Sequence, residues 1–339
     1  MGGTIQANFR KMKDRIIWID WAKALGIMIV IYCHTPQNDN FVNTFLHAFQ
    51  MPLFFMLAGY LHKNSQQTIL ERIKKYWKSL IIPYILLQFI SYPYFLIQLY
   101  VQEGVALNDF TKYVAMPFAQ CLWGIPIDGP TWFIFALLIT KLIADISFKS
   151  RFSAYIIILL CSLSIIGSWI LYKDNQLVIS LFTIHSLSNF FPFFFVGYYL
   201  KTHKIIKGEN WSKSLIKAGI YFTISALLIS VNTNSYPFHR ISFYILGLSG
   251  SFFLINICKT FKNCPDFIQT ASIGNIIILG LHWMFIGTTN FVLEKIFSIE
   301  GGIHYTEIEA VILVILITIA NCIIIKFCQK HFRALLGYR

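Results

Sequence analysis

Ten apolar stretches dominate this 339-residue sequence, and each is long enough, or nearly so, for a helix to cross about 30 Å of membrane hydrocarbon. Hydrophobic residues make up 56% of the chain and charged residues only 13%, about half the charged share of soluble domains. This composition disfavours a soluble enzyme, a disordered chain and a DNA-binding domain. We therefore predict an all-α integral membrane protein, a polytopic bundle of about ten transmembrane helices in a single domain, residues 1–339. The predicted spans are 16–34, 44–62, 80–101, 131–147, 153–172, 178–200, 215–232, 240–258, 273–293 and 308–328.

The first stretch also has the basic flank and the apolar core of a signal peptide. However, Asp20 and Lys23 interrupt that core, no A-x-A cleavage site follows it, and nine more apolar stretches do. We therefore expect a retained first helix that follows a short basic segment, residues 1–15.

The loops between these spans alternate in charge. Of the 28 Lys and Arg residues, 22 fall in one set of loops and at the termini, and only 4 fall in the other set. Because cytoplasmic loops carry this excess, we predict that this basic side, with both termini, is cytoplasmic. The net charge of +13 then needs no nucleic-acid partner, and the lipid bilayer is the predicted partner. The longest outer loop, 102–130, is either a functional lid or a plain interfacial segment.

Several common site chemistries lack their motifs in this chain. The seven cysteines form no C-x-x-C pair and mostly lie in apolar runs, so we predict neither a disulfide framework nor a metal site. The sequence also contains no Walker A loop, no G-x-G-x-x-G, no H-E-x-x-H and no G-x-S-x-G motif. These absences disfavour an ATP-driven pump, a metalloprotease and the usual serine hydrolases.

Three ionisable residues lie within the first predicted helix. Asp20 and Lys23 are three residues apart and can pair on one helix face. His34 follows Lys23 by eleven residues, which is about three turns, so the two lie on one face and about 16 Å apart along the axis. Such groups in a membrane usually face a cavity or a partner. The stripe either lines a path across the membrane or is an interfacial ion pair followed by a helix-end histidine.

Other polar residues fall in later spans. His282 lies near the middle of the ninth span, where a histidine indicates either function or a hydrogen bond between helices. His47 opens the second span, and His185 and Asn189 lie near the outer start of the sixth. These residues are candidates for the same site.

A basic stripe precedes the third span. Arg72, Lys75 and Lys78 recur every three residues, so they share one face if the helix begins this early. Such a stripe suits a phosphorylated ligand, although positive-inside topology with anionic-lipid contact explains it equally simply.

Several segments in order along the chain resemble the acyltransferase-3 family of integral membrane O-acyltransferases, and most closely its fucose 4-O-acetylase-like branch. The first helix matches that family's basic residue, ten intervening residues and histidine at Lys23 and His34. Gln50 and Ala58 depart from the family pattern, because the branch often has His and Ser there. The other matching segments are 49–60, 78–84, 129–133, 191–198 and 273–282.

The resemblance implies that an acyl group, usually acetyl, passes from cytoplasmic acyl-CoA to a hydroxyl of an extracytoplasmic or lipid-linked carbohydrate, in the inner membrane of a bacterium. Acyl-CoA is then the co-substrate, with no metal. The implied general base is His34, and Lys23 holds phosphate or polarises the thioester carbonyl. Further catalytic candidates are Asp20 and His282; Arg72, Lys75 and Lys78 are candidates for CoA, and His47, His185, Asn189 and Trp132 for the acceptor. We expect one hydrated tunnel from the CoA pocket to His34.

Two other functions stay open at this point. A transporter or flippase of a sugar or polysaccharide precursor would also place His and Lys inside a bundle, although no inverted repeat is visible. A structural scaffold for polysaccharide assembly would leave the polar stripe unexplained.

Overall fold

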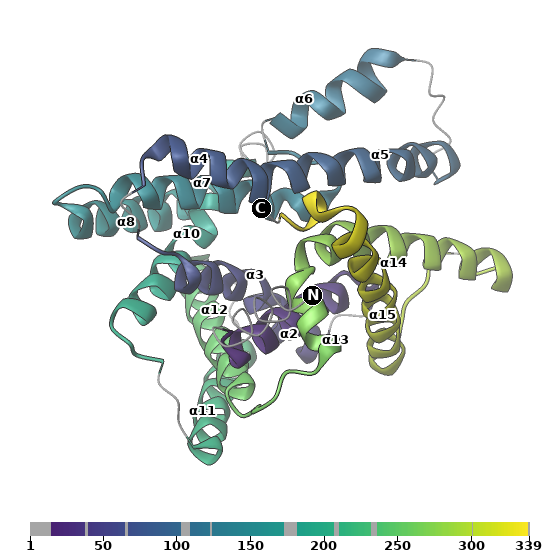
Figure 1. Ribbon diagram of the computed structural model, residues 1–339. Helices are drawn as coiled ribbons and strands as arrows, with labels where there is room; N and C mark the ends of the chain where they lie inside the picture. Colours follow the sequence, from purple (N-terminus) through teal and green to yellow (C-terminus); the bar gives the residue numbers. More distant parts are fainter. Residues whose placement is uncertain are drawn as a thin grey trace, which may run out of the picture.

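The protein, seen here as a computed structural model, is all-helical in the part that the structure describes (Figure 1). The described residues are 15–37, 40–64, 67–102, 109–122, 124–172, 182–206, 210–231, 236–299 and 301–337. The long helices are α2 (Ile17–His34), α3 (Phe41–Leu61), α5 (Ile82–Gln102), α7 (Trp132–Ser147), α8 (Ser153–Tyr172), α10 (Phe182–Thr202), α11 (Trp211–Ser230), α12 (Tyr236–Cys258), α14 (Asn275–Phe297) and α15 (Glu307–His331). The shorter elements are α4 (Ile69–Tyr76), η1 (Trp77–Ile81), η2 (Thr111–Ala115), α6 (Met116–Leu122), η3 (Gly129–Thr131), α13 (Asp266–Ile273) and η4 (Arg333–Leu336).

The prediction of a polytopic helical membrane protein is confirmed. Within the described residues, eight helical segments are long and apolar enough to cross a membrane. Helices α8 and α10 occupy the other two predicted spans. Of the predicted basic segment 1–15, only Arg15 lies among the described residues.

The third span begins earlier than the predicted residue 80. Thr68 and Glu71 form a capping box, in which the Thr68 hydroxyl accepts from the Glu71 backbone N–H and the Glu71 carboxylate accepts from the Thr68 N–H. The helix then runs through α4 and the π-helical turn η1 directly into α5. The basic stripe at 72–78 therefore lies on helix, as its spacing required.

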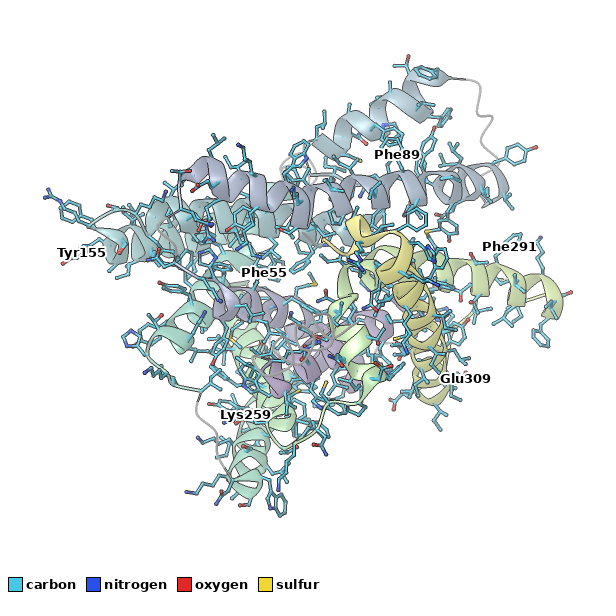
Figure 2. The ribbon with its side chains drawn as sticks, viewed as in Figure 1. Phe55, Phe89, Tyr155, Lys259, Phe291 and Glu309 are labelled. Carbon is cyan, nitrogen blue, oxygen red and sulfur yellow. The ribbon has the colours of Figure 1, made fainter. Side chains whose placement is uncertain are left out.

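The surface of the bundle is apolar where it meets lipid. On α15 the exposed large residues recur at helical spacing, and the opposite face, which includes Leu313, Ile317 and Asn321, is buried. Phe55 in the interior is fully buried, whereas Tyr155 on the projecting end of α8 is 75% exposed (Figure 2). Such a surface is stable only in a membrane, because water would penalise it strongly. The exposed residues of α15 are Ile308, Val311, Ile312, Ile315, Leu316, Ile319, Ile323 and Phe327.

Helix α2 occupies the middle of the bundle, where α3, α12, α13, α14 and α15 contact it (Figure 1). Ala22 and Ala24 are fully buried on it, and small residues of this kind let helices approach closely in a membrane. Helices α3 and α10 also cross closely. A Cβ on Gly59 would lie 1.8 Å from the Phe194 carbonyl oxygen, and one on Gly197 would lie 1.9 Å from that of Met56. These two glycines therefore hold the crossing that supports α2.

Candidate active site

A cavity of about 480 Å³ opens at the basic side of the bundle, between α2, α3, α4, α7 and the start of α14. Lysines from three helices line it: Lys23 on α2, Lys75 on α4 and Lys141 on α7. The C-terminal residues Leu336 and Gly337 form part of its wall. Gly337 has φ +66° and a Cβ there would lie 2.6 Å from the Ser79 carbonyl oxygen, so this close approach requires glycine. The cavity as a whole suits a polyanionic ligand.

Arg72 also lines this cavity, but its charge is already paired. Its Nε donates to Asp145 Oδ1 at 2.9 Å, its Nη2 ion-pairs with the same carboxylate, and Nη2 also donates to the Lys63 carbonyl at 2.8 Å. Both Arg72 and Asp145 are buried. The Tyr76 hydroxyl donates to Asp145 Oδ2 at 2.6 Å. Arg72 therefore anchors α4 to α7, and its guanidinium is already paired within the protein without a ligand.

His62 completes this buried network from the loop that follows α3. Its Nε2 lies 3.2 Å from Asp145 Oδ1, and its side chain is almost fully buried. Burial lowers the pKa of His62 below its usual value, although the hydrogen bond to Asp145 opposes that shift. His62 is therefore a neutral imidazole on the cavity wall at pH 7.

The predicted pairing of Asp20 with Lys23 is wrong. The Asp20 carboxylate instead accepts two hydrogen bonds from the Arg15 guanidinium, both at 3.0 Å, and one from the Ser272 hydroxyl at 2.6 Å. The bidentate fork of arginine fits a carboxylate better than a lysine one turn away. Asp20 thus joins α2 to α13, and Lys23 is left to line the cavity.

The three members of the predicted basic stripe separate in the structure. Arg72 and Lys75 line the cavity, whereas Lys78 is exposed and does not. A three-residue step falls about 60° short of a full turn of an α-helix, so Lys78 lies about 120° around the helix from Arg72. The π-helical turn at Trp77–Ile81 adds to this drift, because each of its turns contains more residues. The stripe prediction therefore holds for one turn only.

Between this cavity and His34 the space along α2 narrows to a void of about 20 Å³, which we call the neck. A void of this size holds about one water molecule. The neck shares four wall residues with the cavity: Phe54, Phe133, Asn275 and Ile276. The other neck residues are Ile27, Val30, Met51 and Leu279.

The expectation of one hydrated tunnel is therefore wrong in its middle part. Ile27 and Val30 follow Lys23 by four and seven residues, so they occupy the same face of α2 between Lys23 and His34. Seven of the eight neck residues are apolar, and Asn275 stands at the junction with the cavity. The polar groups lie at the two ends of α2, and an apolar neck separates them.

Beyond the neck, His34 on α2 meets His282 on α14. Their ring centroids are 5.0 Å apart with the planes at 72°. His34 Nδ1 lies 2.8 Å from the Val30 carbonyl oxygen, and His282 Nδ1 lies 3.0 Å from that of Ile278. Because a carbonyl only accepts, both Nδ1 atoms carry the proton, and each neutral ring keeps its lone pair on Nε2. His282 is fully buried, and its Nε2 has no partner among the described residues. The pair is arranged to accept a proton.

His47 lies at this end of α2 but holds helices together. Its Nε2 donates to the Cys33 carbonyl at 3.0 Å, and its Nδ1 accepts from the Gln50 amide at 3.0 Å. Gln50 therefore acts as the donor that fixes the His47 tautomer. Both ring nitrogens are engaged, so His47 braces α3 against α2.

The remaining predicted acceptor residues lie on α7 and α10. Trp132 packs on Phe190, with ring centroids 5.6 Å apart, and the neighbouring Asn189 is buried. No described contact joins Trp132 or Asn189 to His34. The side chain of His185 lies outside the described residues.

Sequence reasoning did not select Lys141, His62, Asp145 or Tyr76 for this site. A lone lysine near the end of a span resembles a snorkelling side chain, and Arg72 and Asp145 are 73 residues apart. The available signal was a buried Asp on α7 facing a side that is otherwise basic. No group of three or more His, Cys, Asp or Glu in the described part of the chain is placed to hold a metal ion.

One family model matches most of the chain. The family model Acyl_transf_3, which describes an acyltransferase domain, matches residues 16–327. Searches of curated proteins and of solved structures found no match. The matched range contains both ends of α2, the cavity lysines and His282. Since the match covers nearly the whole bundle, the chain belongs to the acyltransferase-3 family of membrane acyltransferases.

Proposed function

We propose that this protein is an O-acyltransferase of the fucose 4-O-acetylase-like branch, located in the inner membrane of a bacterium. It transfers an acyl group, with acetyl as the expected case, from acyl-CoA to a hydroxyl of an extracytoplasmic or lipid-linked carbohydrate. The observation that carries the proposal is the pairing of two sites on one helix. Lysines line a cavity at one end of α2, and two neutral imidazoles meet at the other.

The donor cavity suits the phosphates of CoA. Lys23, Lys75 and Lys141 approach it from three helices, and the carboxylate of Asp145 is taken up by Arg72, Tyr76 and His62. The cavity therefore has an excess of positive charge in a region that is partly shielded from water, where attraction to phosphate is strong. On this proposal the basic side faces the cytoplasm, where acyl-CoA is available.

The chemistry belongs at the imidazole pair. His34 Nε2, with its lone pair free, takes the proton from the acceptor hydroxyl as the oxygen attacks the thioester carbonyl carbon. The C–O bond forms, the C–S bond breaks, and the protonated His34 returns the proton to the CoA thiolate. His282 lies beside His34 with a buried Nε2 that has no partner among the described residues, and this lone pair favours the imidazolium form of His34 as it develops.

The neck accounts for separation of the two substrates. In the structure it is too narrow for the pantetheine arm, so donor binding has to move side chains such as Phe54 and Phe133, whose rings are 5.8 Å apart. A closed apolar neck keeps cytoplasmic water and solutes from the imidazole pair when no donor is bound.

The test is transfer of radiolabelled acetyl from acetyl-CoA to candidate glycans by purified protein. We expect His34→Ala to lower the transfer rate by about 10²–10⁴-fold with CoA binding retained, because general-base help is typically of that size. His304→Ala, which changes an exposed histidine, is the control and should behave as wild type. Normal transfer by His34→Ala would exclude His34 as the base. Glycan transport without any acyl transfer by wild type would instead support a transporter.

A further inference from the structure

Lys141 is a charged residue of the cavity that the sequence analysis did not single out. It lies on α7, its ammonium is 5.8 Å from the Tyr76 ring, and the charges that act on it are Lys23, Lys75, Arg72 and Asp145. Three of these four neighbours are cations. Ammonium groups around one cavity repel each other, so an anion that joins them would stabilise the arrangement.

Among the described residues, the two carboxylates nearest these lysines, Asp145 and Asp20, already have other partners. Asp145 already accepts hydrogen bonds from Arg72 and Tyr76 and lies within 3.2 Å of His62. Asp20 is held by Arg15 and Ser272. Among the described residues, neither Lys23 nor Lys141 has an Asp or Glu within ion-pair distance. An anion from outside the chain can therefore pair with both lysines.

The distance along α2 indicates which part of a donor reaches them. The eleven residues from Lys23 to His34 rise by about 16 Å. The pantetheine arm has about 13 chain atoms between its phosphate and its sulfur, and at the spacing of an extended peptide such a chain spans about 15 Å. An extended arm from a phosphate at Lys23 is therefore long enough to bring the thioester to the level of His34.

Building on the proposed function, we propose that Lys141, with Lys23, binds the phosphate that directly precedes the pantetheine arm. Lys141 is a donor-positioning residue: it sets how far the arm extends through the neck. The ligand class is a phosphopantetheine thioester, and the adenosine portion of CoA is not what Lys141 recognises.

The experiment compares three donors: acetyl-CoA, acetyl-4′-phosphopantetheine and acetyl-pantetheine. In Lys141→Met we expect kcat/KM to fall by about 10- to 100-fold for the two donors that carry the phosphate, mainly through KM, because a charged hydrogen bond is lost. Acetyl-pantetheine, which lacks the phosphate, should react equally with variant and wild type. Lys141→Arg should restore most of the loss. Lys78→Met is the matched control, since Lys78 belongs to the same basic side but lies outside the cavity.

Every other outcome contradicts either the role of Lys141 or the proposed function. An equal loss for all three donors would show a merely structural role, and a loss for acetyl-CoA alone would assign Lys141 to the adenosine end. Either result overturns the inference while leaving the proposed function intact. Calorimetry with 4′-phosphopantetheine identifies the opposite result, in which the phosphate site exists but the proposed function fails. If wild type binds it, Lys141→Met does not, and wild type transfers no acyl group, the phosphate site stands and the proposed function fails.

Discussion

At Lys23, α2 faces a cavity of about 480 Å³ with charged walls, whereas at His34 it faces a second imidazole, that of the fully buried His282. At the first end, lysines from three helices line a cavity that can admit a ligand. At the second end each ring is tied to the backbone of its own helix, which fixes its tautomer before any substrate arrives. On the proposed function this contrast separates binding from chemistry: one end recognises charge, and the other supplies an orientated base.

The largest effect is expected from Asp145→Asn. Asp145 belongs to the network of Arg72, Tyr76 and His62 beside the cavity, and we call this network with the cavity lysines the charged end. Asp145 neutralises Arg72 among several lysines, and removal of one partner of a buried ion pair typically costs about 3–5 kcal/mol. We expect a large fall in the thermal midpoint of the detergent-solubilised protein, and partial recovery when CoA is added. Asp266→Asn, which breaks the exposed pair with Lys326, should leave the midpoint unchanged. Equal midpoints for the two variants would show that the charged end is well hydrated.

A smaller effect is expected from changing the neck, through Ile27→Ser. Ile27 is buried between the two ends of α2, and a serine there shortens the side chain and admits water toward His34. We expect hydrolysis of acetyl-CoA in the absence of acceptor to rise by about tenfold, because water then competes for the thioester. Labelled acetate release measures this reaction.

Ile29→Ser is the control for the neck variant. Ile29 is partly buried on the same helix but does not line the neck, so its replacement carries a similar packing cost without opening that path. If both serine variants raise hydrolysis equally, general loosening of α2 is the cause. If neither does, the neck is not the barrier between the two ends.

Much of this architecture was visible in the sequence because its determinants are local. Apolar runs predict spans one segment at a time, and the positions of Lys23 and His34 on one face follow from helical period alone. The same period also places Ile27 and Val30 on that face, which the prediction of a hydrated tunnel overlooked. The approach of His282 to His34 was predicted only as a shared site, since their distance depends on how α14 packs on α2.

The charged network was less predictable because its partners are distant in the chain. The contacts of Asp145 with Arg72, Tyr76 and His62 join segments far apart in sequence, and no spacing rule identifies such a set. The π-helical turn after Tyr76 has no simple sequence signal, and it adds to the helical drift that takes Lys78 away from the cavity. Lys141 becomes informative only once α2 and α7 are seen to enclose the same cavity.

The smallest expected effect concerns the pH dependence of the charged end. Burial lowers the pKa of His62, so the unfolded chain binds a proton more readily than the folded protein does. The stability that neutral His62 contributes is therefore complete above its unfolded pKa of about 6.5 and is lost as the pH falls through that value toward the folded pKa. We expect His62→Gln, which can still donate to Asp145, to lose less of its thermal midpoint between pH 7.5 and 5.5 than wild type does. Exposed His304→Gln should keep the wild-type dependence, and an unchanged slope in His62→Gln would show that water reaches this network.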